Sequence, residues 1–128
     1  MFTHVMLGAD DIDAAKAFYD ATLATLGGPE GVVDERGRVH YTHDGGRLMI
    51  TRPINGQPAS CANGSTIGFH AKSPEMVDAW QATGLAHGGT AIEDPPGIRE
   101  ATGGRKLYLA YLRDPAGNKI CAVHPVRG

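Results

Sequence analysis

The sequence has few cysteines, no long apolar run and no excess of basic charge. Cys61 and Cys121 are the only cysteines in 128 residues, too few for a disulfide framework, so we expect a reduced, cytoplasmic setting. No apolar run approaches the ~18 residues that a membrane-spanning helix needs. Met1–Thr3 leads directly into strand-like sequence, so we expect no signal peptide. The net charge is −2 and the basic residues are scattered, which argues against a nucleic-acid partner.

The chain repeats one pattern of residues. Residues 2–28 and residues 65–89 each predict an apolar strand that carries a histidine, then a helix, then a closing Gly-Gly pair. Three short strand-like segments follow each helix, at 32–35, 38–43 and 47–52 in the first half and at 90–93, 106–113 and 119–124 in the second. The order β-α-β-β-β is therefore expected twice.

Turn-forming residues divide the chain between these halves. Residues 53–64 contain no periodic run and predict a linker, so we expect one domain over residues 1–128, with one module at about 1–52 and another at about 65–128. Within the second module, residues 95–105 are rich in proline and glycine and predict a long loop. Pro125 is expected to close the last strand, because proline has no N–H to give to a ladder.

Local signals place both helices. Asp10 or Asp11 predicts the N-cap of a helix that runs to about Leu26, because a short carboxylate accepts from free N–H groups of the first turn. Ser73 predicts the second N-cap, with Pro74 at the first helical position, where a missing N–H costs nothing.

The double pattern, the Phe18-Tyr19 pair in the first helix and the turn Arg113–Asn118 (RDPAGN) together resemble the vicinal oxygen chelate superfamily. This superfamily contains glyoxalase I, bleomycin-resistance proteins and extradiol dioxygenases. The resemblance covers nearly the whole chain, and its most specific stretch is the final hairpin, residues 107–124. The segment Pro96–Arg99 also looks like a glyoxalase-like subgroup. The resemblance implies an α+β fold in which two βαβββ modules form a curved mixed sheet that cups a site.

The resemblance also implies four positions on the cup that hold a metal in metal-bearing members. This sequence has His4 on the first strand, His70 on the fifth, Met49 where glyoxalases tend to have a glutamate, and Cys121 where the other glutamate is usual. Strand alternation independently puts Gly68 with His70 on one face. Both departures remove a carboxylate, which leaves neither a glyoxalase-type base nor the carboxylate of an extradiol dioxygenase.

Two interpretations of this quartet stay open. In the first, His4, His70 and Cys121 hold a divalent metal, with zinc preferred, because three N or S ligands suffice for a catalytic zinc site. In the second, the pocket holds no metal, Cys121 behaves as a small buried hydrophobe, and Met49 is a pocket wall.

Further substrate-binding candidates join Met49 and Cys121. Arg99, on the predicted loop before the seventh strand, is a candidate for an anionic substrate, although a solvated arginine is the plainer interpretation. Tyr108 and Tyr111 fall on opposite faces of one strand, and alternation does not decide which of them enters the cup. Of the two, we name Tyr108 as the substrate-binding candidate.

Two functional hypotheses follow. The chain is either an enzyme that acts on a small oxygenated organic molecule, by metal-assisted lyase, isomerase or dioxygenase chemistry, or a non-catalytic protein that sequesters a small molecule without a metal. The presence of both histidines favours the enzyme, and the loss of both carboxylates favours the non-catalytic binding protein. We also expect a homodimer, because family members commonly complete the cup by pairing modules, and we expect no nucleic-acid or membrane partner.

Overall fold

The computed structural model describes residues 1–127, and in them the order β-α-β-β-β occurs twice. The first module contains β1 (Val5–Gly8), α1 (Ile12–Thr25), β2 (Val32–Val33), β3 (Val39–His43) and β4 (Gly46–Thr51). The second contains β5 (Ile67–His70), α2 (Pro74–Ala86), β6 (Thr90–Glu100), a 3₁₀ turn at Thr102–Gly104, β7 (Lys106–Arg113) and β8 (Lys119–Val126). The predicted fold class, α+β with two βαβββ modules, is confirmed.

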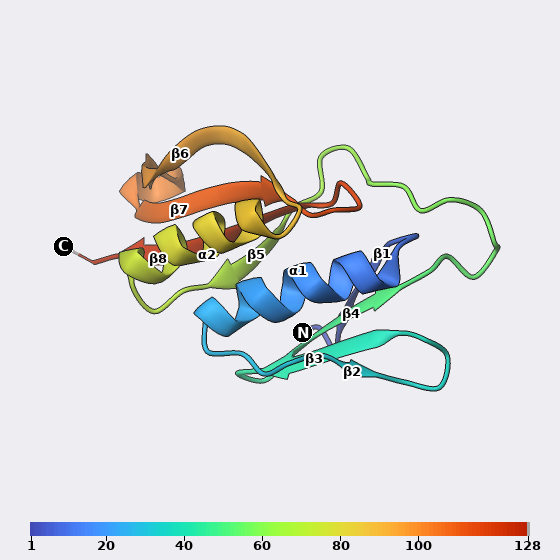
Figure 1. The fold of residues 1–128 in the computed structure, drawn as a ribbon. Helices are drawn as coiled ribbons and strands as arrows, with labels where there is room; N and C mark the ends of the chain where they lie inside the picture. Colours follow the sequence, from blue (N-terminus) through green and yellow to red (C-terminus); the bar gives the residue numbers. More distant parts are fainter. Residues whose placement is uncertain (128) are drawn as a thin grey trace.

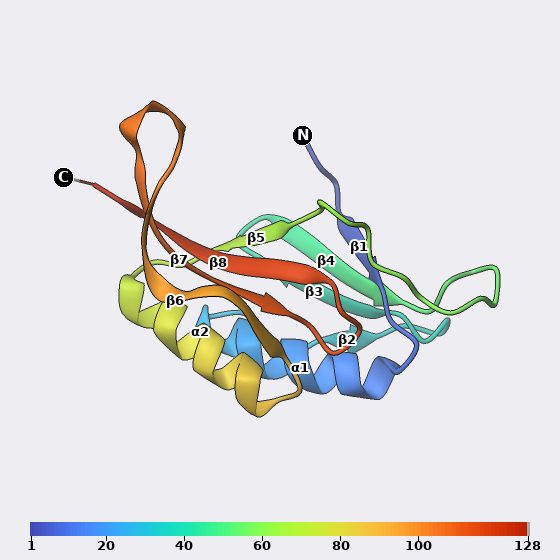
Figure 2. The same ribbon diagram turned by 90° about the horizontal axis from the view of Figure 1, so that it is seen from above.

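Each module forms its own four-stranded sheet. The strand orders are β1-β4-β3-β2 and β5-β8-β7-β6, and in each sheet the first strand runs parallel to its neighbour while the other pairs are antiparallel. Helices α1 and α2 pack against each other (Figure 1). Both helices lie on one side of the sheets, and the chain's N-terminus lies on the other side (Figure 2). We call the sheet surface turned away from the helices the cup face.

The helix boundaries have the local causes that the sequence predicts. The Asp11 carboxylate accepts from the Ala14 N–H at 3.0 Å, which makes Asp11 the N-cap of α1. The Ser73 hydroxyl accepts from the Met76 N–H at 3.2 Å at the start of α2. Each side chain satisfies a helical N–H that has no partner within its own helix. No helix within residues 1–127 has the length and apolar character that crossing a membrane would require.

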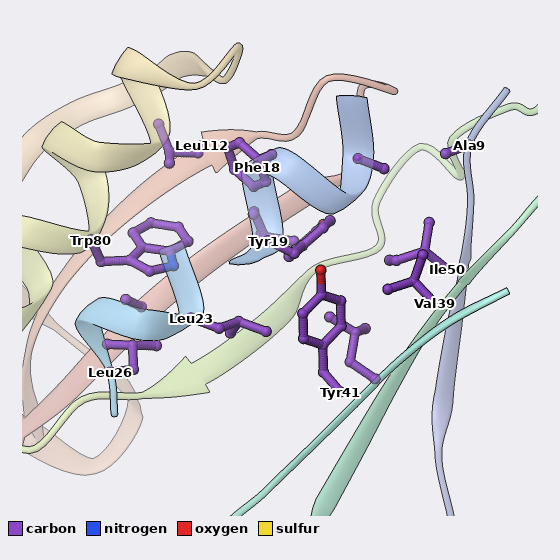
Figure 3. Packing of buried hydrophobic residues seen from close by; sticks show 14 of the residues in the cluster. Ala9, Phe18, Tyr19, Leu23, Leu26, Val39, Tyr41, Ile50, Trp80 and Leu112 are labelled. Carbon is purple, nitrogen blue, oxygen red and sulfur yellow. The ribbon is translucent and has the colours of Figure 1, made fainter. Parts of the chain in front are cut away.

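A single apolar core lies between the helices and the sheets (Figure 3). Phe18 and Trp80 are fully buried, and Leu112 reaches them from β7. Gly84 makes this packing possible, because a Cβ built at that position of α2 would overlap the Leu112 side chain. Helix α2 therefore lies closer to its sheet than a helix with a larger residue at this position would.

Strand β6 is longer than the sequence predicts. The expected loop at 95–105 begins inside a strand, since residues 97–100 pair with β7 after a bulge between Ile92 and Gly97. Pro95 and Pro96 lie inside this bulge, where the ladder is interrupted and no N–H is needed, and Gly103 and Gly104 lie in the 3₁₀ turn before β7. Strand β8 also continues past Pro125 to Val126. Its pairing with β5 ends at Val123, so the proline sits where β8 has a ladder on one side only.

One buried carboxylate joins the two modules. Asp114 lies in the turn between β7 and β8, and its Oδ2 accepts from the Tyr19 hydroxyl of α1 at 2.6 Å. Its Oδ1 accepts from the Asn118 N–H at 2.9 Å, and the Asn118 amide donates to the Gly8 carbonyl of β1 at 3.0 Å. Burial and the Asp114 charge raise the pKa of Tyr19 well above its usual value. A turn of the second module is thus bound to a helix and a strand of the first.

We expect Asp114→Ala to lower the free energy of unfolding by about 3 kcal/mol, because it removes the acceptor of the buried Tyr19 hydroxyl and of one N–H of the Asn118 amide. Tyr19→Phe, which removes only one hydroxyl, should cost about 1 kcal/mol. Urea unfolding followed by circular dichroism measures both. Asp94→Asn, at an exposed carboxylate, is the matched control and should stay within about 0.5 kcal/mol. Equal stability of Asp114→Ala and Asp94→Asn would contradict the role given to Asp114.

Candidate functional site

A cavity of about 400 Å³ lies between the two modules. Strands β1 and β5 flank it, the end of α1 forms its floor together with Tyr41 and Leu48, and the turn between β3 and β4 forms a third wall. We call this cavity the seam pocket. Its lining comes from four parts of the chain: residues 1–5, Leu23 and Leu26 of α1, Tyr41 to Leu48 of the hairpin except Thr42 and Gly45, and residues 67–70.

The walls of the seam pocket are apolar and its rim is polar. Leu23, Leu26, Tyr41 and Leu48 are buried in the folded chain and line the floor, where Ile67 and Phe69 of β5 complete the wall. The rim carries His4, His43, Asp44, Arg47 and His70, all of them exposed or half-exposed. Apolar walls with a few convergent polar groups are the usual composition of a small-molecule site, and such sites commonly have volumes of roughly 300–1,000 Å³.

Three rim groups, His4, His43 and Asp44, already have partners. The His43 Nε2 lies 3.2 Å from the Asp44 carboxylate, in the turn between β3 and β4. The His4 Nδ1 lies 2.9 Å from the hydroxyl of its neighbour Thr3. Within residues 1–127, the guanidinium of Arg47 makes no hydrogen bond or ion pair to the protein. The strongest unused charge at the rim is therefore a cation.

The four positions that the resemblance singles out do not converge. His4 and His70 line the seam pocket from opposite modules, whereas Met49 and Cys121 do not line it. Met49 is buried on the cup face of β4, opposite Met6 and His40. Cys121 is buried on the cup face of β8, where a Cβ at Gly68 would lie 3.4 Å from its sulfur.

The tyrosine on the cup face of β7 is Tyr111, whereas Tyr108, the substrate-binding candidate, lies on the opposite face. The Tyr108 hydroxyl donates to the Asp78 carboxylate of α2 at 2.8 Å, so this side chain lies on the helix side of β7. Tyr111 is the residue opposite Cys121 in the ladder and shares its face. Strand alternation could separate the two tyrosines but could not assign the faces, because both faces of β7 carry leucines.

A polar cluster on the cup face of the second sheet was not foreseen. Lys119 forms an ion pair with Glu93, and its Nζ lies 4.8 Å from the centre of the Tyr111 ring. Glu93 has a φ of 60°, an uncommon value for a residue other than glycine, at the β6 bulge. The Arg99 guanidinium donates to the backbone carbonyls of Asp94 and Pro95 at 2.9 Å each. The bulge is pinned by Arg99, which is therefore already engaged.

These residues do not fit a metal of the kind that the family implies. Within residues 1–127, no three His, Cys, Asp or Glu side chains come close enough together to hold an ion. Burial, opposed by the nearby Lys119 and assisted by Glu93, raises the pKa of the Cys121 thiol to about 11. A thiol must lose its proton to act as a ligand, so the burial of Cys121 opposes metal binding.

Comparison with known proteins places this arrangement in a family. A sequence model of the Glyoxalase/Bleomycin resistance protein/Dioxygenase superfamily matches residues 1–122, and the chain belongs to this superfamily. A glyoxalase/bleomycin resistance protein from Albidiferax ferrireducens T118 has a TM-score of 0.92 and 57% identity, over 97% of this chain and 98% of that chain. No curated protein matches the sequence.

More distant structures share the fold. A lactoylglutathione lyase from Agrobacterium tumefaciens has a TM-score of 0.62 and 28% identity, over 97% of this chain and 92% of that chain. A glyoxalase/bleomycin resistance protein/dioxygenase family enzyme from Burkholderia phytofirmans PsJN has a TM-score of 0.72 at 18% identity, over 97% of this chain and 98% of that chain, which shows the fold alone.

In native protein, we expect the Cys121 thiol to react with iodoacetamide at about pH 8 roughly a hundredfold more slowly than in urea, because a pKa of about 11 leaves little thiolate. The rate should rise as the pH is raised toward 11. The assay uses the Cys61→Ala variant, in which Cys121 is the single remaining thiol, and mass spectrometry measures its alkylation.

The same assay tests the hypothesis of a metal held by His4, His70 and Cys121. We expect equal alkylation rates with Zn²⁺ and with a chelator. Zinc protection that is lost in His4→Ala or His70→Ala, but kept in Met49→Leu, would establish the three-ligand site instead.

Proposed function

We propose that the chain binds a small oxygenated organic molecule in the seam pocket by direct side-chain contact, without a metal. The observation that carries this proposal is the pocket itself, a cavity of about 400 Å³ with buried apolar walls and a polar rim. Superfamily membership supports it, because the superfamily includes proteins described by drug resistance as well as by catalysis.

The chemistry of the lining favours binding over metal-assisted catalysis. The two positions where the resemblance expects glutamates carry Met49 and Cys121, and neither faces the pocket. The only carboxylate in the lining, Asp44, is exposed and pairs with His43. Removal of a proton beside a carbonyl needs a base within reach of the substrate. The pocket floor offers none, and the candidate bases of the lining are the rim histidines His4, His43 and His70. The metal-assisted lyase and dioxygenase hypotheses keep one supporting observation, that His4 and His70 line the same cavity.

We expect a two-ring aromatic probe to bind one-to-one in buffer that contains a chelator, since the apolar walls supply the contact surface. Isothermal titration calorimetry with 2-naphthoate and with 2-naphthalenemethanol measures this. Val5→Phe, which enlarges a side chain that lines the pocket, should weaken the tighter probe about tenfold or more.

Val33→Phe is the matched control, because Val33 is exposed on β2 and does not line the pocket. It should bind as the unchanged protein does, and circular dichroism checks that both variants fold. Failure of both probes to bind would refute the proposal, as would binding by Val5→Phe with unchanged affinity. Binding that appears only after Zn²⁺ is added would favour the metal-assisted alternative.

We further propose that the chain forms a homodimer through its cup side. Met1 and Phe2 at the pocket rim and Met6 on β1 are large apolar side chains left exposed in the single chain. Such side chains near one another on a surface are typical of protein contacts. One chain already brings its two modules together, so a dimer is needed to cover this surface rather than to join the modules.

Light scattering at micromolar concentration should give twice the chain mass. Met6→Glu should shift the population toward monomer, because it places a charge in the covered surface. Ile54→Glu, at an exposed apolar residue outside the pocket lining, should leave the mass unchanged. A monomeric unchanged protein would contradict the dimer, and dissociation by Ile54→Glu alone would move the interface to the linker.

A further inference from the structure

We infer that the seam pocket selects an organic anion with an apolar body, such as an aromatic carboxylate, with its acid group held at the rim by Arg47. This inference rests on the proposed function and adds to it the chemical class of the ligand and its orientation. Three features of the pocket carry it: a floor without free polar groups, an unpaired cation at the rim, and a helix end beneath the floor.

The floor offers no partner to a polar group. Leu23, Leu26 and Leu48 present only carbon atoms, and all three are buried. Tyr41 is the one floor residue with a hydroxyl, and that hydroxyl donates to the Asp20 carboxylate at 2.7 Å, on the α1 side. Figure 3 shows the Tyr41 ring rising from β3 with its oxygen directed toward α1. The inner end of a ligand must therefore be apolar, since a polar group placed there would lose its hydration without a new partner.

The rim offers cationic and N–H groups from three separate elements. Arg47 stands on β4, His4 precedes β1, and His70 ends β5. The one acidic group in the lining, Asp44, is already paired with His43. Arg47 has no side-chain partner among residues 1–127, so its guanidinium is free to hold a carboxylate through two parallel N–H donors. The balance of unused groups at the rim thus favours an anion over a cation.

The direction of α1 decides which end of the ligand points outward. Leu26 is the C-cap of α1, so the negative end of the helix dipole lies beneath the floor. A carboxylate at the floor would meet this negative potential and no donor. At the rim, the same carboxylate meets Arg47, and its apolar body can rest on Leu48 and Phe69. The field of the helix and the unpaired guanidinium therefore favour the same orientation.

The two probes named above differ only at the head group, and their comparison tests this inference. We expect the unchanged protein to bind 2-naphthoate about tenfold or more tightly than neutral 2-naphthalenemethanol, because only the acid forms a charge-assisted bond with Arg47. Arg47→Gln should remove most of this preference and change the affinity for the alcohol less than about twofold. Raising NaCl from about 20 mM to about 500 mM should reduce the preference in the unchanged protein, since the rim is exposed.

Arg36→Gln is the matched control, because Arg36 is an exposed arginine outside the pocket lining and its loss lowers the net charge equally. It should keep the preference for the acid. Equal affinity for the two probes, or tighter binding of the alcohol, would overturn the inference and leave the proposed function standing. A preference that survives in Arg47→Gln would also overturn it, because the acid would then be held elsewhere. Failure of both probes refutes the proposed function itself.

Discussion

The arrangement of the two modules depends on the hydrogen bonds of the buried Asp114 carboxylate. It binds the Tyr19 hydroxyl directly, and through Asn118 it is tied to the Gly8 carbonyl. The two sheets have no shared ladder, so the modules are held by this network and by the contact between α1 and α2. The seam pocket lies between the modules. The RDPAGN turn carries much of the resemblance to the family. It joins the two modules and does not line the seam pocket.

Local signals in the sequence were sufficient for most of the fold. The caps Asp11 and Ser73 act within one helical turn, so they can be read without knowledge of distant residues. Strand β6 could not be read in this way. Pro95 and Pro96 correctly indicate an interruption, but the return to the ladder at Gly97 depends on β7, which comes later in the chain. Pairing between distant segments is the information that a local pattern does not contain.

The candidate site was predictable to a smaller extent. The duplication predicts that His4 and His70 face one cavity, and both line the seam pocket. Alternation tells which residues share a face of a strand but not which face is the cup. The sequence therefore could not decide between Tyr108 and Tyr111, and the structure places Tyr111 beside Cys121. Arg47 shares its face with Met49 by the same alternation, so a signal for it existed. That the Arg47 side chain has no partner among residues 1–127 is a property of the folded chain alone.

The separation of the two sheets has a mechanical consequence. Strands β1 and β5 flank the pocket but belong to different sheets, so widening the space between them breaks no ladder bond. Each sheet is stiff, because its strands are cross-linked along their length, while the line between the sheets is compliant. Rotation about the packed helices can therefore admit a bulkier guest without breaking a ladder bond, at the expense of side-chain contacts and of the Asp114 network between the modules. A closed barrel of the same size would have to separate a pair of hydrogen-bonded strands to do this. The present architecture therefore favours ligands of variable size that share one type of group at the rim.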